Sequence, residues 1–297
     1  MPEGAAERYT HGHHESVLRS HVWRTAENSA GYLLRYLRPG DRILDVGCGP
    51  GTITLDLARH VPRGQVLGID ASAEVLDQAR GQARVRGLRN VTFALADAYA
   101  LDETDMGNLG GGPTVVHAHQ VLQHLARPVA AVRQMASTLQ EGGLLAVRDA
   151  DYSAMTWYPE LPQLERWREV YLAVARHNGG EPDAGRRLLG WVQEADLTTV
   201  EASAGTWCFA TPEDRAWWGS LWAARVTRSD LGLQAVRLGI SDPGELAEIA
   251  AGWRTWAEAP DGWFAVVHGE VIARVGQNER GAKPGYGKTN DARLEKQ

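Results

Sequence analysis

The stretch ILDVGCGPGTIT, residues 43–54, decides the fold of this chain. It begins as an apolar strand, passes through Gly47, Gly49 and Gly51, and continues from Thr52 with the period of a helix. Glycines are needed at such a turn because the chain bends sharply and its backbone approaches a ligand more closely than a Cβ would permit. The stretch therefore predicts a strand, a ligand-binding loop and a helix in immediate succession.

The residues around this loop alternate between two patterns. Between Asp41 and Asp151, short apolar or β-branched runs alternate with segments of helical period. This alternation is typical of an α/β fold, Rossmann-like and doubly wound, with a parallel sheet and crossover helices. The predicted strands are 42–46, 65–69, 91–95, 114–119 and 143–149, and the predicted helices are near 51–60, 72–86 and 127–140.

The second half of the chain is expected to complete the same sheet. Helical segments at 160–177 and about 184–195 precede a strand at 198–210, and further helices from 213 to 257 precede a last strand at 263–275. We expect the two late strands to form an antiparallel hairpin at the sheet edge. The helices between them then form an insertion over one edge or mouth of the sheet.

Composition excludes several classes of function. With 297 residues, 43% of them hydrophobic, the chain can bury a large core. A net charge of −6 without a dense basic stretch argues against binding nucleic acid, because phosphate neutralisation needs clustered Lys and Arg. The sequence has two distant cysteines, no signal peptide and no long apolar run. These features predict a cytoplasmic protein that does not enter a membrane.

Carboxylates follow the next two predicted strands. Asp70 ends the second strand, nineteen residues after Gly51, where it can accept hydrogen bonds from both hydroxyls of a ribose. Asp97 follows the third strand, where it can accept from an adenine amino group. Three successive strand ends thus carry groups that suit a nucleoside.

Four stretches resemble the class I S-adenosylmethionine-dependent methyltransferases, in particular the ubiquinone/menaquinone-biosynthesis type that methylates small molecules. They are LRPGDRILDVGCGPGTITLDLA, VLGIDAS, ALADAYAL and LQEGGLLAVRD, within about residues 30–152. The resemblance implies a seven-stranded sheet with a terminal antiparallel hairpin, and S-adenosylmethionine as cofactor. Carried over by position, it implies that Asp45, Gly47, Cys48, Gly49 and Gly51 hold the methionine end, Asp70 the ribose, Ala71, Asp97 and Ala98 the adenine, while His119 and Gln120 face the cofactor.

The glycine spacing separates this chain from nicotinamide enzymes. It is GxGxG rather than the GxGxxG that places a pyrophosphate on a helix N-terminus, and the preceding Asp45 would repel a pyrophosphate. One position departs from the family, since Thr114 stands where its members commonly carry an acidic residue.

Four regions are predicted along the chain. The first region, 1–40, contains an N-terminal cap helix that runs from 14 to 37, and the second is a cofactor-binding core at 41–152. The third region, 153–275, completes the sheet and includes a helical lid at about 212–258. The fourth is a disordered tail at 276–297. The tail contains all three lysines of the chain and shows no apolar periodicity.

Three ionisable residues after the fifth predicted strand are candidate catalytic groups. Asp149, Asp151 and Tyr152 would lie at the carboxyl end of the sheet, where the pocket opens. Methyl transfer needs a base only if the acceptor must lose a proton, and the two carboxylates could act as that base or bind an acceptor amine. The alternative is that they cap a helix or lie in a solvated loop.

The N-terminal stretch YTHGHHESVLRSH, residues 9–21, is rich in histidine. His14 and His21 are seven residues apart and share a helix face, which we expect to look into the pocket mouth and to handle a proton near neutral pH. Tyr9 would cover the sulfonium. No pair of ligands has the spacing of a zinc site, so no metal is predicted. The alternative is a cap helix with ordinary, partly buried polar residues.

Seven of the eleven tryptophans lie between Trp207 and Trp263. On a helix, Trp218 and Trp222 share one face, which predicts either the core of the insertion or a wall of the substrate pocket. We expect an enzyme that methylates a small-molecule acceptor, either quinone-like, prenyl or another secondary metabolite. The alternative is a non-catalytic cofactor-binding sensor or scaffold. A homodimer is compatible with the sequence.

Overall fold

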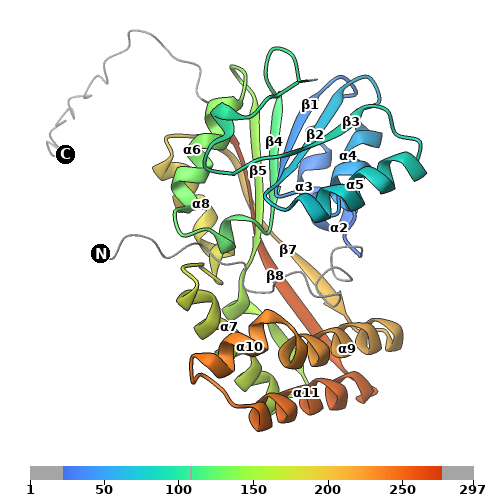
Figure 1. Ribbon diagram of the computed structural model, residues 1–297, viewed down its shortest axis with the longest axis vertical. Helices are drawn as coiled ribbons and strands as arrows, with labels where there is room; N and C mark the ends of the chain where they lie inside the picture. Colours follow the sequence, from blue (N-terminus) through green and yellow to red (C-terminus); the bar gives the residue numbers. More distant parts are fainter. Residues whose placement is uncertain (1–22, 108, 276–297) are drawn as a thin grey trace, which may run out of the picture.

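A computed structural model describes residues 23–107 and 109–275. These residues form an eight-stranded mixed sheet with helices on both faces and a separate layer of helices at one end (Figure 1). The parallel part has the order β3-β2-β1-β4-β5. Its strands are β1 (Arg42–Val46), β2 (Gln65–Asp70), β3 (Val91–Leu95), β4 (Val115–His119) and β5 (Leu144–Ala150). The predicted α/β fold and its five parallel strands are confirmed.

The last part of the sheet is antiparallel. Strand β8 (Trp263–Arg274) pairs with β5 along one edge and with β7 (Thr198–Phe209) along the other, as the predicted hairpin requires. An eighth strand, β6 (Thr156–Tyr158), pairs with the beginning of β8. The sequence did not predict β6, because three residues are too few to show the alternation of a strand.

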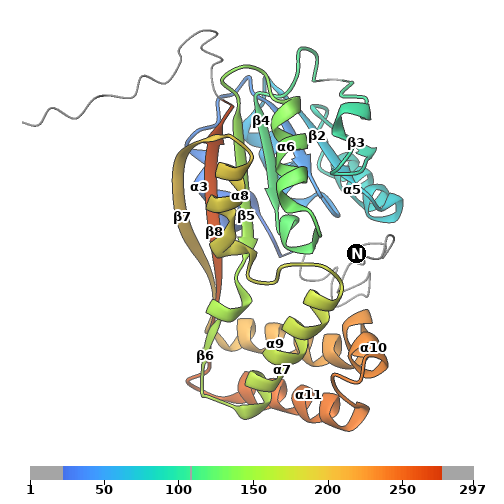
Figure 2. The same ribbon diagram turned by 90° about the vertical axis from the view of Figure 1, so that its left-hand side faces the viewer.

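Helices cover both faces of the sheet because successive strand residues point to opposite sides. Ile43 and Leu44 are both fully buried, in the cores of different faces. One face is covered by α2 (Ala26–Ser29), α3 (Gly31–Leu34), α4 (Thr52–His60) and α5 (Ala73–Val85). The other is covered by α6 (Pro128–Thr138) and α8 (Leu188–Glu194), as Figure 2 shows.

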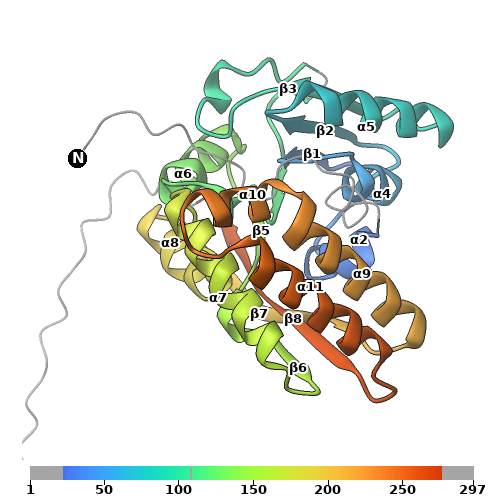
Figure 3. The ribbon, with the colours of Figure 1, turned by 60° about the horizontal axis from the view of Figure 1, so that its bottom comes forward.

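Four further helices pack together beyond the carboxyl ends of the parallel strands. They are α7 (Pro162–His177), α9 (Pro212–Arg228), α10 (Asp230–Arg237) and α11 (Pro243–Glu258), and they form one layer in Figure 3. Their core is aromatic: the Trp167 ring lies 4.6 Å from that of Trp222 and 4.9 Å from that of Trp253, between centroids. Phe209 of β7 and Phe264 of β8 are buried in the same core, so the two long strands join this helical layer to the sheet.

The predicted cap helix over 14–37 is wrong for the residues that the structure describes. Residues 23–37 contain the short helices α2 and α3 instead. A capping box between Thr25 and Asn28 starts α2 at Ala26, and Ala30, with φ −131° and ψ 15°, leaves the helical region and ends it. The side chains of Tyr9, His14 and His21 and the stretch 276–297 lie outside the described residues.

None of the helices in the described residues is both long and apolar enough to cross a bilayer.

Candidate functional site

A cavity of about 380 Å³ lies between the carboxyl ends of the parallel strands and the helical layer. Its lining comes from the loop after β1, the ends of β2 and β4, the turn after β5, strand β7 and helix α9. Nine of the predicted cofactor-binding and catalytic residues line it: Asp45, Gly47, Cys48, Gly49, Asp70, Ala71, His119, Gln120 and Tyr152.

The glycine loop needs its glycines for two physical reasons. Gly47, Gly49 and Gly51 have φ of 68°, 54° and 82°, in the left-handed region that side chains disfavour. A Cβ on Gly47 would lie 2.4 Å from Cγ2 of Val121, so the loop can lie against the turn after β4 only without it. Gly51 does not line the cavity and is the N-cap residue of α4.

Asp70 is held at the cavity wall by the backbone. Its Oδ2 accepts from the Gly49 N–H at 2.9 Å, and its Oδ1 accepts from the Ser72 N–H at 3.0 Å. Each carboxylate oxygen can accept more than one hydrogen bond, so these two backbone donors orient the group without excluding hydroxyl donors.

The other two acidic residues of the predicted cofactor set have different surroundings. Asp45 is buried, and its oxygens accept from the Thr54 hydroxyl at 2.5 Å and meet Nδ1 of His117 at 2.7 Å. Asp97 is exposed, accepts from the Tyr99 N–H at 2.9 Å and, with Ala98, is not part of the cavity lining.

His119, at the end of β4, brings an unsatisfied polar group to the cavity. It is 5% exposed, and neither ring nitrogen has a hydrogen-bond partner among the described residues. Burial, together with the nearby Arg148 and Arg24 guanidinium groups, holds the pKa of His119 well below its usual range. The imidazole is therefore neutral and can both donate to and accept from a ligand.

Gln120 links three segments at the cavity wall. It has a φ of 54°, which is uncommon for a residue with a side chain. Its Oε1 accepts from Arg24 at 2.6 Å, and its Nε2 lies 2.9 Å from Nε2 of His268. Because Nδ1 of His268 donates to the Val266 carbonyl at 3.1 Å, its Nε2 is free to accept from Gln120. The side chain of Gln120 thus joins the start of the described chain to β4 and β8.

Asp149 lies behind the cavity rather than in its lining. It is fully buried, and its Oδ1 accepts from the Gln123 N–H at 3.1 Å, at the turn Leu122–His124. Burial raises the pKa of Asp149 to about 8. Gln123 and His124 line the cavity, so Asp149 supports the turn that carries them.

Asp151 is also outside the cavity lining. Both its oxygens accept from the Arg186 guanidinium at 2.6 Å, and one also accepts from the Ala154 N–H at 3.1 Å. This corresponds to the capping alternative for Asp151, whereas Tyr152 next to it does reach the cavity.

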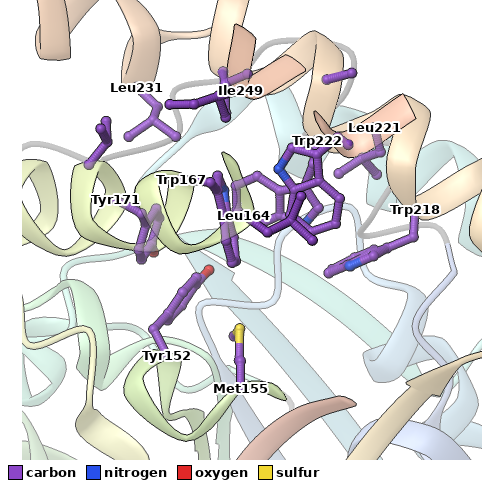
Figure 4. Packing of buried hydrophobic residues seen from close by; sticks show 14 of the residues in the cluster. Tyr152, Met155, Leu164, Trp167, Tyr171, Trp218, Leu221, Trp222, Leu231 and Ile249 are labelled. Carbon is purple, nitrogen blue, oxygen red and sulfur yellow. The ribbon is translucent and has the colours of Figure 1, made fainter. Parts of the chain in front are cut away.

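The sequence predicted only part of the aromatic wall of the cavity. Trp218 and Trp222 belong to the core of the helical layer, which confirms the core interpretation (Figure 4). They also line the cavity, and their role as a wall of the substrate pocket stays a prediction. Trp207, one of the seven late tryptophans noted in the sequence, lines it as well, and so does Arg225, which was not predicted. A signal existed for Arg225, because positions 218, 222 and 225 share one face of a helix.

Within residues 23–107 and 109–275, His, Cys, Asp and Glu side chains form no group of three or more that could hold a metal ion.

Comparison with known proteins decides the family. A family model described as a methyltransferase domain matches residues 37–205. The chain is also 34% identical over 275 residues to an uncharacterised methyltransferase of Schizosaccharomyces pombe, covering 89% of this chain and 95% of that protein. This chain belongs to the methyltransferase family. A probable methyltransferase of Aspergillus luteorubrus is 27% identical to this methyltransferase. The alignment covers 91% of this chain and 98% of that protein.

Solved structures agree with this fold. A putative methyltransferase from Bacillus halodurans superposes on the methyltransferase with a TM-score of 0.52 at 18% identity, covering 82% of this chain and 99% of that one. Coclaurine N-methyltransferase, solved with S-adenosylhomocysteine, gives a TM-score of 0.50 at 18% identity over 83% of this chain and 71% of its own. The predicted class I fold is confirmed, and S-adenosylmethionine is the cofactor of this class.

Proposed function

We propose that this methyltransferase transfers a methyl group from S-adenosylmethionine to a small organic molecule bound against the tryptophans of the cavity. One observation carries the proposal. One cavity is lined both by the glycine loop with Asp70 and by the indole rings of Trp207, Trp218 and Trp222. Polar groups that suit a nucleoside and aromatic rings that suit an acceptor thus line one space.

The residues present fit the cofactor. The left-handed glycines bring backbone close to the ligand, and Asp70 is oriented to accept from ribose hydroxyls. The unsatisfied nitrogens of His119 need a partner that the described chain does not supply. Bound S-adenosylmethionine would supply an electrophilic methyl group on a sulfonium sulfur.

The protein's own contribution is then to hold the acceptor and exclude water. An acceptor enclosed by buried rings is desolvated and fixed in direction, which supplies much of the acceleration in a displacement reaction. The neutral His119 can accept a hydrogen bond from an acceptor hydroxyl. Asp149 and Asp151 act through the turns they stabilise rather than on the acceptor.

The wall of the acceptor end favours flat, apolar molecules. Indole faces bind rings and conjugated chains by contact area, which suits a quinone-like, prenyl or other secondary-metabolite acceptor. The helices α9 to α11 would act as the lid over this end. A cytoplasmic location and a homodimer stay predictions from the sequence.

The cofactor placement is tested with Asp70→Ala. Losing an acceptor for hydroxyl hydrogen bonds should weaken the binding of S-adenosylhomocysteine by about tenfold or more, because hydrogen bonds to a charged group contribute about 1.5–3 kcal/mol. Calorimetry with the purified protein measures this. Asp77→Ala is the control, since Asp77 is an exposed carboxylate on α5 paired with Arg80. Unchanged affinity in Asp70→Ala would show that the ribose binds elsewhere.

Turnover is tested by incubation with S-adenosylmethionine and a panel of phenols, quinones, amines and prenyl compounds. Release of S-adenosylhomocysteine with one panel member supports the proposed reaction. Tight cofactor binding without product from any compound would count against it.

A further inference from the structure

Asp45 and His117 face each other across two parallel strands. The register of β1 and β4 pairs the two residues, and they are only 3% and 0% exposed. Nδ1 of His117 lies 2.7 Å from Oδ1 of Asp45. Because an ionised carboxylate only accepts hydrogen bonds, Nδ1 is the ring nitrogen that carries the hydrogen. The Thr54 hydroxyl of α4 donates to Oδ2 at 2.5 Å, so donors from two elements hold the plane of this carboxylate.

Asp45 is a buried carboxylate without a basic partner in the part of the chain that the structure describes. No arginine within residues 23–107 and 109–275 forms an ion pair with it. Nε2 of His117 has no hydrogen-bond partner among these residues either. This favours a neutral imidazole, because an unpaired buried N–H costs more on a cation than a bare lone pair costs on a neutral ring. The charge of Asp45 is therefore not balanced by the described protein.

The cavity is the place from which a balancing charge can come. A buried carboxylate is costly unless a group of opposite charge reaches it, and Asp45 lines the cavity. Asp70 is the other carboxylate among the described lining residues, and backbone donors orient it for ribose hydroxyls. Asp45 is thus the carboxylate left for a cation, and the methionine end of S-adenosylmethionine carries a primary ammonium group.

We propose that His117 is a positioning residue, which orients the Asp45 carboxylate so that it receives the ammonium group of the cofactor. This inference rests on the proposed function, since it concerns the cofactor of the same cavity. Each oxygen of Asp45 accepts one hydrogen bond from the protein and can accept another, so the ammonium group binds without displacing either donor. His117 itself does not line the cavity and acts through Asp45.

The loss of His117 should affect one end of the cofactor site only. Without the imidazole, the carboxylate of Asp45 is held by Thr54 alone and can rotate away from the ammonium group. Asp70 keeps its two backbone donors, because they belong to the glycine loop and to the turn after β2. Binding of the adenosine part should therefore be retained.

The test compares two ligands that differ only in the ammonium group. They are S-adenosylhomocysteine and its desamino analogue, in which hydrogen replaces the α-amino group, and each is titrated by calorimetry into the purified protein. We expect the parent protein to bind S-adenosylhomocysteine at least about tenfold more tightly than the analogue, because a hydrogen bond to a charged group is among the stronger ones.

Two amide substitutions of His117 separate the position of the donor from polarity. His117→Gln should lower the preference by about fivefold, because its amide reaches the place of Nε2 and the donor to Asp45 is lost. His117→Leu removes the donor as well and should give the same decrease. His117→Asn should retain most of the preference, because its amide N–H can occupy the place of Nδ1.

Val116→Ala is the matched control, because Val116 is the preceding residue of β4, is fully buried and packs in the core of the opposite face. It should lower Tm and leave the preference unchanged. Binding of the desamino analogue by each variant reports that the adenosine part of the site is intact.

The outcomes distinguish the two proposals. If the parent protein binds neither ligand, the proposed function is wrong. If it binds both ligands equally, if His117→Gln and His117→Leu keep the full preference, or if His117→Asn loses as much of it as they do, only the role of His117 is overturned.

Discussion

Three carboxylates at the ends of parallel strands have three different roles, because their immediate partners differ. Asp70 accepts from two backbone N–H groups at the cavity wall and remains accessible to a ligand. Asp151 is paired with the Arg186 guanidinium and caps a turn. Asp149 is buried beneath the turn at Leu122–His124, and its pKa is raised to about 8 by desolvation. Position at a strand end alone therefore does not identify a catalytic carboxylate.

The raised pKa of Asp149 predicts a pH dependence of stability. In the folded protein this carboxyl keeps its proton up to about pH 8, whereas in the unfolded chain it ionises near its ordinary pKa of about 3.9. The folded state binds more protons between these values, so the contribution of Asp149 to stability decreases as pH rises through this window. The limiting slope is about 1.4 kcal/mol per pH unit for one group.

Asp149→Asn removes this titration and should flatten that part of the profile. Denaturant unfolding of both proteins at several pH values from 5 to 8 measures the difference, in which the contributions of the buried histidines cancel. Asp77→Asn, at an exposed carboxylate, should run parallel to the parent protein. Parallel curves for Asp149→Asn as well would mean that Asp149 is already ionised when folded.

At the scale of elements, the tryptophan wall of the cavity depends on how closely α9 approaches α11. Gly219 follows the cavity-lining Trp218, and a Cβ there would lie 2.7 Å from the Ala257 Cβ and 2.8 Å from the Trp253 carbonyl oxygen. The two helices therefore touch through backbone at this point, and the contact holds the tryptophans of both helices in one core.

Gly219→Ala should push α9 and α11 apart. Overpacking of this kind costs about 1–3 kcal/mol, which lowers Tm by about 2–4 °C for each kcal/mol in a domain of this size. Gly190→Ala is the control, since a Cβ at Gly190 in α8 would meet no atom within 4 Å, and alanine is the better helix former. Thermal unfolding followed by circular dichroism compares the two. An equal loss in both variants would contradict the close-contact interpretation.

At the scale of the whole molecule, the cavity lies between two parts with separate cores. One part is the sheet with its covering helices, and the other is the helical layer of α7 and α9 to α11 (Figure 1). Strands β7 and β8 run through both parts, and both would supply contacts to a ligand. A bound ligand should therefore stabilise the two parts together.

Saturation with S-adenosylhomocysteine tests this coupling. At a concentration of about 100 times Kd, binding to the folded state adds about 2.7 kcal/mol, which corresponds to a rise in Tm of about 5–10 °C. Tryptophan fluorescence reports mainly on the helical layer, where most indoles lie, and far-UV circular dichroism reports on the whole chain. Both signals should shift by the same amount. A shift confined to circular dichroism would show that the helical layer unfolds independently.

The sequence by itself determined the α/β class, the order of the five parallel strands along the chain and the loop at Gly47–Gly51. These features depend on local spacing: the period of apolar residues, glycines at a turn and a carboxylate at the next strand end. The sequence also determined the family, because the motifs that identify the methyltransferases lie within these local features. The break between α2 and α3 was missed, although the Thr25–Asn28 capping box is local too.

Only the tertiary structure decided which polar groups meet at the cavity. Asp151 is paired with Arg186, Asp149 supports the turn after β4, and Arg225 of α9 reaches the same cavity as His119 of β4. Each of these outcomes depends on residues far apart in the chain. Burial, and with it the charge state of a carboxyl or an imidazole, follows from what packs around a group, and no local pattern encodes that.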